Sequence, residues 1–114
     1  SVVADKDLDG LLRPLLPLFS LVVATRSQSR RARLPADLAA GIAAIAAIGG
    51  AGAAPPPVVV RDDPGAALAE ARRQLGERFG GGLVVVAGSI FLVGEIRARL
   101  LGETPDPRAV SDPL

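Results

Sequence analysis

Four short apolar runs, each followed by a segment with helical spacing, constrain the fold of this chain more than any other feature. The runs lie at residues 2–3, 20–25, 58–60 and 83–87, and each contains adjacent valines. Adjacent β-branched residues that do not alternate with polar ones are typical of strands buried on both faces, as in parallel sheets. Parallel strands require crossover connections, which the helical segments between the runs supply. The alternation predicts the order β-α-β-α-β-α-β-α.

Capping residues and helix breakers mark the ends of the predicted helices. Asp7 is placed to cap the first helix, and Pro14 shortens or kinks it because proline lacks a backbone donor. The pair Asp63–Pro64 supplies a cap and a first-turn proline for the third helix. Ser89 begins the fourth helix, and Gly102 ends it.

Apolar stripes on the predicted helices indicate which faces pack on the sheet. In the second helix, which begins near Pro35, the apolar residues at helical spacing are Leu38, Ile42, Ile45 and Ile48. In the fourth helix, the residues expected to face inward are Val93, Ile96 and Leu100. The spacing of Glu95 and Arg99 predicts an i, i+4 ion pair outside that stripe.

The length of 114 residues is enough for one domain and too short for two. We expect a small Rossmann-like α/β domain over residues 1–102, with a mainly parallel sheet and helices on both faces. The first run looks like the end of a longer strand, so we expect the domain to be N-terminally truncated, as the C-terminal part of a longer protein. Residues 103–114 contain three prolines and are expected to form a C-terminal tail.

The chain contains neither cysteine nor histidine. Disulfide frameworks, thiol nucleophiles, Cys/His zinc sites and Ser-His-Asp triads are therefore excluded. Thirteen basic and twelve acidic residues give a net charge of +1, which does not favour nucleic acid or an anionic membrane as a partner. Any chemistry depends on carboxylates, hydroxyls, Lys6 and the arginines, and we expect no metal site in this chain.

Residues 38–60 carry no charge and are numerous enough to cross a bilayer. The middle of this stretch, residues 49–57, consists of glycines, alanines and three consecutive prolines, which break a helix and contribute little transfer free energy. A helix, a loop and a buried strand describe the stretch better than a membrane span. No signal peptide is visible, and we expect a cytoplasmic protein without a membrane partner.

Ligands of open parallel α/β sheets bind beyond the carboxyl ends of the strands. Four segments of this chain occupy such places, namely residues 5–7, 25–33, 61–63 and 88–89. The segment 61–63 is interpreted as a capped turn. Residues 80–82 are all glycine, but they precede a strand and do not follow one, so they end a helix and do not hold a phosphate.

Gly88–Ser89 has the clearest possible mechanism among these segments. Gly88 allows a tight turn, and Ser89 stands at a helix N-terminus, where free N–H groups favour an anion such as a carboxylate. The structural alternative is that Ser89 only caps its own helix. The two roles are compatible, because one hydroxyl group serves both.

Two further segments combine charges that suit an anionic or zwitterionic ligand. In Asp5-Lys6-Asp7, Lys6 is suited to a phosphate or carboxylate and an aspartate to an amine, whereas the alternative is a helix cap with solvated neighbours. The loop at residues 25–33 carries four arginines that suit a phosphate or carboxylate, or else form a solvated surface: Arg26, Arg30, Arg31 and Arg33.

Three segments resemble one protein family and follow each other in that family's order. They are Ala4-Asp5-Lys6-Asp7-Leu8, the Arg31-Ala32 pair ahead of Pro35-Ala36-Asp37-Leu38-Ala39, and Val86-Ala87-Gly88-Ser89-Ile90-Phe91-Leu92-Val93-Gly94-Glu95. Together they resemble the C-terminal domain of bacterial bifunctional folylpolyglutamate synthase/dihydrofolate synthase, of the Mur ligase superfamily. The resemblance extends over roughly residues 2–101, and its most specific part is the stretch from Gly88 to Glu95.

The resemblance implies an ATP-dependent carboxylate–amine ligase. In that family a folate or pteroate carboxylate is activated as an acyl phosphate, and the amine of L-glutamate attacks it. The C-terminal domain closes over the active site and holds the glutamate. By resemblance, Ser89 and its neighbour Gly88 are glutamate-binding residues, and Asp5, Lys6, Asp7 and Arg31 contact the interdomain cleft. No catalytic residue is implied in this chain.

The family's P-loop, its metal ligands and its Asp-Gly-Ala-His-Asn-Pro segment have no counterpart in this chain. ATP and Mg²⁺ are bound mainly by the N-terminal domain in the family, so the resemblance implies that this chain alone binds neither and is inactive. The implied partners are L-glutamate, a folate substrate and the N-terminal ATPase domain. Three alternatives remain open: the C-terminal lobe of a Mur-type peptidoglycan-precursor amino-acid ligase, a non-catalytic α/β interaction module, and a small membrane-associated protein.

Overall fold

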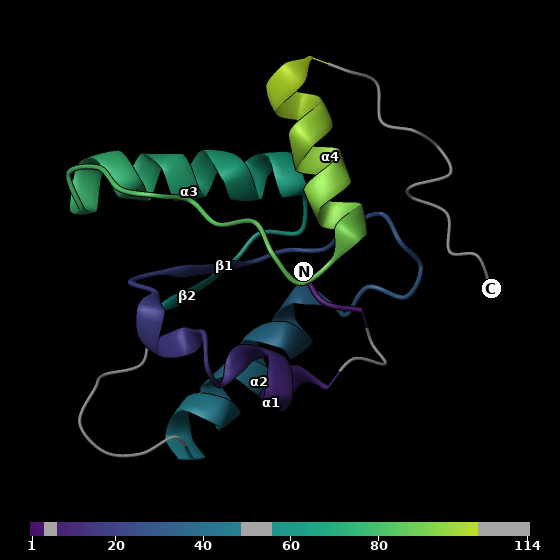
Figure 1. Cartoon of the computed structure of the whole chain (residues 1–114), viewed down its shortest axis with the longest axis vertical. Coiled ribbons are helices and arrows are strands. Elements are labelled where there is room, and N and C mark those ends of the chain that lie inside the picture. The colour runs from purple at the N-terminus through teal and green to yellow at the C-terminus, as the bar shows by residue number, and fades with distance from the viewer. Residues whose placement is uncertain (4–6, 49–55, 103–114) are drawn as a thin grey trace.

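The computed structural model describes residues 1–3, 7–48 and 56–102. In chain order, the elements in these ranges are α1 (Leu8–Leu12), the short 3-10 helix η1 (Leu16–Leu18), β1 (Val22–Ala24), α2 (Pro35–Ile48), β2 (Val58–Val60), α3 (Pro64–Arg78) and α4 (Ile90–Leu101). The helices α1 and α2 lie on one side of the strands, and α3 and α4 lie on the other (Figure 1). Asp5 and Lys6, and residues 103–114, lie outside the described residues.

The strands β1 and β2 form a parallel pair, as the valine runs predict. Val22 is aligned with Val58, Val23 with Val59, and Ala24 with Val60. The connecting helix α2 packs against both strands, and α3 packs against β1. The expected α/β class, with a parallel sheet and helices on both faces, is confirmed at this level. Of the four strands expected for a Rossmann-like sheet, the described residues form two, β1 and β2.

Two of the four expected strands are absent from the described residues. Val3 forms an isolated antiparallel bridge with Ala32 in place of a parallel strand. Residues 83–87 pair with no strand within the described part of the chain, and Leu83 is 84% exposed. A strand requires a hydrogen-bonding neighbour, and this segment lies across an apolar cavity from β1. The predictions of strands at residues 2–3 and 83–87 are therefore wrong for this structure.

The predicted helix ends are confirmed. The helix α1 stops at Leu12, two residues before Pro14. The carboxylate of Asp63 caps α3 by accepting a hydrogen bond from the N–H of Ala66 at 2.9 Å. Gly102 ends α4 in the left-handed conformation, with φ of 69°. Local capping chemistry thus determines where these helices begin and end.

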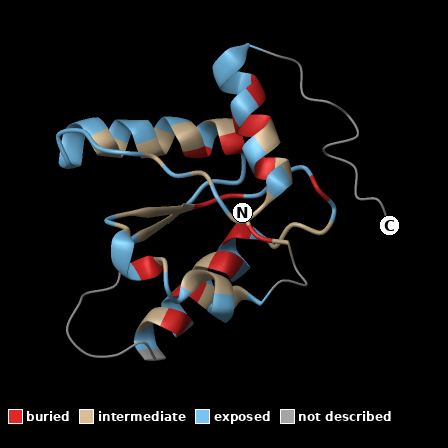
Figure 2. Cartoon of the chain, viewed as in Figure 1, coloured by how far each residue is buried: buried red, intermediate tan, exposed pale blue. Residues whose placement is uncertain are grey.

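The core lies between α2, η1 and the sheet (Figure 2). Its buried apolar residues are Val2, Leu16, Ala24, Leu38, Ile42 and Ile45. The α2 residues among them confirm the stripe predicted for that helix, of which the side chain of Ile48 lies outside the described residues. Because α2 contacts both strands, this apolar stripe covers one face of the sheet.

The buried face of α4 differs from the prediction. Ile96 is buried as expected, but Val93 and Leu100 are 43% and 52% exposed. Arg99 forms its ion pair with Asp63, at 3.6 Å, and the predicted pair with Glu95 is not formed. The helix is rotated so that Glu95 faces the protein interior, where it is 4% exposed.

We expect the free energy of unfolding to depend on pH through the carboxylate of Glu70 on α3. The guanidinium of Arg73 donates to it at 2.6 and 3.1 Å, and the amide of Gln74 donates at 3.0 Å. These groups lower the pKa of Glu70 from 4.5 to about 2. A depressed folded-state pKa stabilises the fold above pH 4.5, and this contribution is lost as the pH falls toward 2.

We therefore expect Glu70→Gln to lose less free energy of unfolding than the wild type between pH 4.5 and pH 2, because glutamine does not titrate. Urea unfolding at a series of pH values measures this difference. Parallel decline of the two proteins over that range would contradict the prediction.

Candidate functional site

The loop of residues 25–33, which follows β1, contains most of the buried polar side chains of the described chain. Thr25, Ser27 and Ser29 are 4%, 1% and 1% exposed. The hydroxyl oxygen of Ser27 accepts from the N–H of Ser29 at 3.4 Å, and that of Ser29 accepts from the N–H of Arg31 at 3.3 Å. Serine hydroxyls that bond backbone groups two residues away stabilise tight turns. The buried serines therefore fix the shape of this loop from within.

Glu95 attaches the loop to α4. Its carboxylate oxygen Oε1 accepts from the N–H of Gln28 at 2.7 Å. A hydrogen bond to an ionised acceptor is stronger than one between neutral groups, and burial of the carboxylate requires such a partner. This role of Glu95 is not predicted from the sequence. The available signal is that Glu95 precedes Ile96 and follows Leu92 by three residues, which places it on the apolar face of the helix.

The loop is also attached to α3 and to the first residues of the chain. The hydroxyl of Thr25 donates to the carbonyl of Asp62, just before α3, at 3.4 Å. The N–H of Ser27 donates to Oγ of Ser1 at 3.2 Å. The N–H of Arg33 donates to the carbonyl of Val2 at 2.9 Å. The loop is therefore hydrogen-bonded to three neighbouring segments at the carboxyl end of β1.

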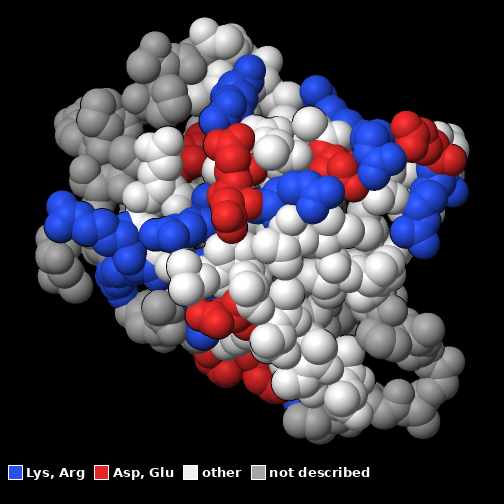
Figure 3. Space-filling model, turned by 180° about the vertical axis from the view of Figure 1, so that it is seen from behind, with Lys and Arg blue, Asp and Glu red and all other residues white. Residues whose placement is uncertain are grey.

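The arginine side chains determine which ligands this loop can bind. Backbone N–H groups along the loop already donate to protein oxygens, so an anion meets side chains here and not a nest of free amides. Arg26 and Arg30 are exposed, and Arg31 and Arg33 are half-buried. In the view from behind, basic side chains gather on the side of the molecule where this loop lies (Figure 3). Guanidinium groups bind carboxylates and phosphates in bidentate geometry.

Ser89 caps α4, as the structural interpretation predicts. Its hydroxyl oxygen accepts from the N–H groups of Phe91 at 3.2 Å and Leu92 at 3.4 Å. The cap leaves the hydroxyl hydrogen of Ser89 for a further acceptor. Gly88 has φ of 98°, and a Cβ at this position would collide with the carbonyl oxygen of Ser1. The predicted need for glycine at the turn is therefore confirmed.

In the structure, Ser1 and Val2 connect Gly88–Ser89 with the arginine-bearing loop. The carbonyl of Ser1 lies against Gly88, and Oγ of Ser1 accepts from the loop at Ser27. Val2 continues this connection through its bond with Arg33. The N-terminus of α4 and the backbone of the loop that carries the four arginines therefore lie at the same end of β1, where a ligand is expected from the sequence.

Asp7 and Arg61, which belong to two further predicted segments, have local structural roles. Asp7 is exposed and caps α1, where its carboxylate accepts from the N–H of Gly10 at 3.1 Å. Arg61 donates to the carbonyl of Val60 at 2.7 Å and lies 3.7 Å from Glu70. These contacts agree with the interpretation of both segments as capped turns.

No group of three acidic side chains that could hold a metal ion occurs within residues 1–3, 7–48 and 56–102. In the same ranges, no helix has the length and apolar character needed to cross a membrane. Comparison of the chain with protein-family models, curated proteins and solved structures finds no match in any of the three.

Proposed function

We propose that this chain is the C-terminal, glutamate-binding lobe of a cytoplasmic ATP-dependent ligase that adds L-glutamate to folate or dihydropteroate. The observation that carries the proposal is the meeting of Gly88–Ser89 with the arginine-bearing loop at the carboxyl end of β1. The stretch from Gly88 to Glu95 that resembles the folylpolyglutamate synthase family supports it, because both ends of that stretch contribute to this site.

The chemistry of L-glutamate fits such a site. The molecule has two carboxylates, which need two anion-binding groups, and an amine that must remain accessible for attack. In the proposal, the N-terminus of α4 and the hydroxyl of Ser89 bind one carboxylate. Arg31, held at the loop by Ser29, binds the other through its guanidinium group. By resemblance to the family, Asp5, Lys6 and Asp7 are proposed to contact the cleft between the lobes.

The reaction is divided between two lobes in this proposal. ATP, bound with Mg²⁺ mainly by an N-terminal ATPase domain, would supply the phosphoryl group that converts the folate carboxylate into an acyl phosphate, with release of ADP. The glutamate nitrogen then attacks the acyl carbon, phosphate leaves, and the nitrogen loses a proton. The residues of this chain hold the glutamate so that its amine faces that carbon. Fixed orientation of the two reactants is their contribution to the rate.

Ser89→Ala in the full-length enzyme is expected to raise the KM for glutamate about tenfold or more with little effect on the KM for ATP. The estimate follows from the loss of one hydrogen bond to a charged group, about 1.5–3 kcal/mol. Steady-state kinetics with each substrate varied in turn provides the measurement.

The matched control is Asp63→Ala, which removes a helix cap of the same kind from α3. Both variants lose about 0.5–2 kcal/mol of stability through the lost cap. Only Ser89→Ala is expected to change the glutamate KM. Equal changes for both substrates, or equal kinetics in the two variants, would assign Ser89 a structural role alone and favour a non-catalytic α/β module.

A further inference from the structure

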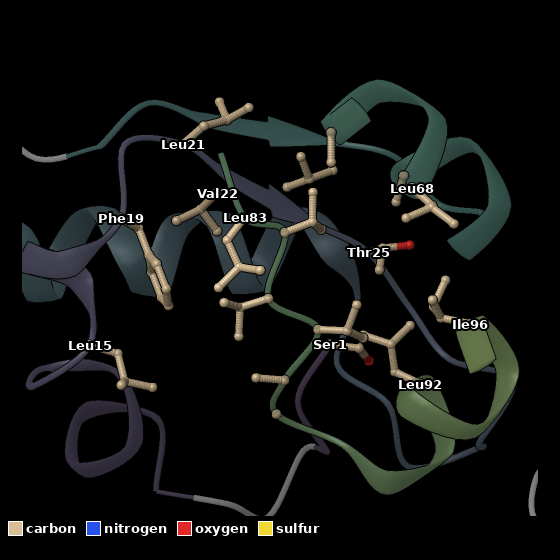
Figure 4. A pocket seen from close by; sticks show the side chains of 18 of the residues that line it. Ser1, Leu15, Phe19, Leu21, Val22, Thr25, Leu68, Leu83, Leu92 and Ile96 are labelled. Atoms are coloured by element: carbon tan, nitrogen blue, oxygen red, sulfur yellow. The ribbon is translucent and has the colours of Figure 1, made fainter. Parts of the chain in front are cut away.

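An apolar cavity of about 660 Å³ lies beside β1, on the side away from β2. The apolar face of α3, including Leu68 and Leu75, forms one wall. Leu15 and Phe19 contribute to another wall, and the segment of residues 83–87 borders the cavity opposite β1. Figure 4 shows lining side chains around the open space, with Ser1 between Leu15 and Phe19 on one side and Leu92 and Ile96 on the other.

Two unpaired backbone edges border this cavity. On β1, the N–H of Val22 donates to the carbonyl of Pro57, and the carbonyl of Ala24 accepts from the N–H of Arg61, both at 3.0 Å. Polar groups alternate between the two edges of a strand, so the N–H and C=O of Val23 point away from β2. On the opposite side, residues 83–87 pair with no strand among the described residues.

Ser1 and Val2 lie where a strand between these two edges would end. Oγ of Ser1 bonds to Ser27, which follows the carboxyl end of β1. The carbonyl of Ser1 lies against Gly88, which follows the carboxyl end of the segment 83–87. From Ser1 the cavity extends to Phe19 and Gly82, which precede the amino ends of β1 and of that segment. The cavity therefore follows the path of a strand parallel to both.

We infer that this cavity takes one extended apolar strand, parallel to β1, whose carboxyl end lies beside Ser1. The strand pairs with β1 on one edge and with residues 83–87 on the other, which makes a four-stranded parallel sheet. It consists of about five β-branched, uncharged residues, because the bordering segment has five residues and helices cover both faces. The inference does not depend on the ligase proposal.

The exposure of apolar side chains in residues 83–87 supports an apolar strand as the occupant of the cavity. Leu83 and Val85 are 84% and 57% exposed in a run of five apolar residues, which is unusual for a sequence of high β-propensity. A strand with unpaired edges is a site for addition of another strand, since backbone groups pair without regard to sequence. The apolar walls select a strand whose side chains are apolar on both faces.

The first test adds five residues ahead of Ser1 of the full chain, as a valine–isoleucine segment or as a glycine–serine segment of equal length. Amide hydrogen exchange measures the protection of Val23 and of residues 83–87. We expect at least tenfold slower exchange at these amides with the valine–isoleucine segment only. Equal exchange rates in the two extended chains would overturn the inference.

The second test locates the added strand without relying on stability. Because Ser1 lies beside Gly88, the third residue ahead of Ser1 is expected to lie beside Val85. The chain has no cysteine, so an introduced pair is the only one. A cysteine at that added position should form a disulfide with Val85→Cys on mild oxidation, and not with Ala47→Cys on the exposed side of α2. No disulfide with Val85→Cys, or equal yields at both positions, would contradict the proposed path.

Discussion

Replacement of Ile42 by alanine is expected to lower the free energy of unfolding by about 2–5 kcal/mol. Ile42 is 2% exposed and packs in the core cluster with Leu38 and Ile45 of α2 and with Ala24 of β1. Truncation removes buried apolar surface and leaves a cavity that the neighbouring side chains fill only in part. The loss is a large share of the roughly 5–15 kcal/mol that stabilises an ordinary domain. Urea unfolding followed by circular dichroism measures it.

The control for this prediction is Ile42→Val, which removes one methylene group and keeps the β-branched shape. It is expected to cost about 0.5–1.5 kcal/mol. A cost below about 1 kcal/mol for Ile42→Ala would mean that α2 does not cover the sheet as the structure has it.

Glu95→Ala is expected to cost about 1.5–3 kcal/mol and to release the arginine-bearing loop from α4. The substitution leaves the N–H of Gln28 without the carboxylate that accepts from it at 2.7 Å. The lost hydrogen bond contributes strongly to stability because its acceptor is a buried carboxylate. We expect faster amide exchange at Gln28 and, in the proposed full-length ligase, a raised glutamate KM through displacement of Arg31.

Two further variants separate the hydrogen bond from the general effect of losing a carboxylate. Glu95→Gln keeps an acceptor oxygen at the same place and is expected to restore most of the protection at Gln28. Glu77→Ala removes an exposed carboxylate that pairs with Arg73 at 2.8 Å, and it should cost at most about 1 kcal/mol. Unchanged exchange at Gln28 in Glu95→Ala would show that the loop is held by other contacts.

Features that depend on neighbouring residues in the sequence were predictable. The caps at Asp7, Asp63 and Ser89 each bond to backbone N–H groups two or three residues later, so the sequence contains both partners. The stripe on α2 follows from helical periodicity alone. The pairing of β1 with β2 follows from two buried valine runs joined by one helix.

Features that depend on long-range contacts were not predictable. Residues 83–87 have the composition of a strand, but strand formation depends on a partner edge, which no local pattern reveals. The role of Glu95 depends on Gln28, which lies 67 residues away. Arg99 has two possible acidic partners, Glu95 on its own helix and Asp63 just before α3. The rotation of α4 favours Asp63. In each case tertiary packing decides among alternatives that the sequence leaves open.

The proposed role of this chain as the glutamate-binding lobe of a folate–glutamate ligase is open to a direct assay. A fusion of the chain to the N-terminal ATPase domain of a folylpolyglutamate synthase is tested for ATP-dependent addition of glutamate to a folate. We expect activity that requires this chain and falls with Ser89→Ala, while Asp63→Ala retains it. A folded fusion that adds no glutamate even at high glutamate concentration would rule out this role.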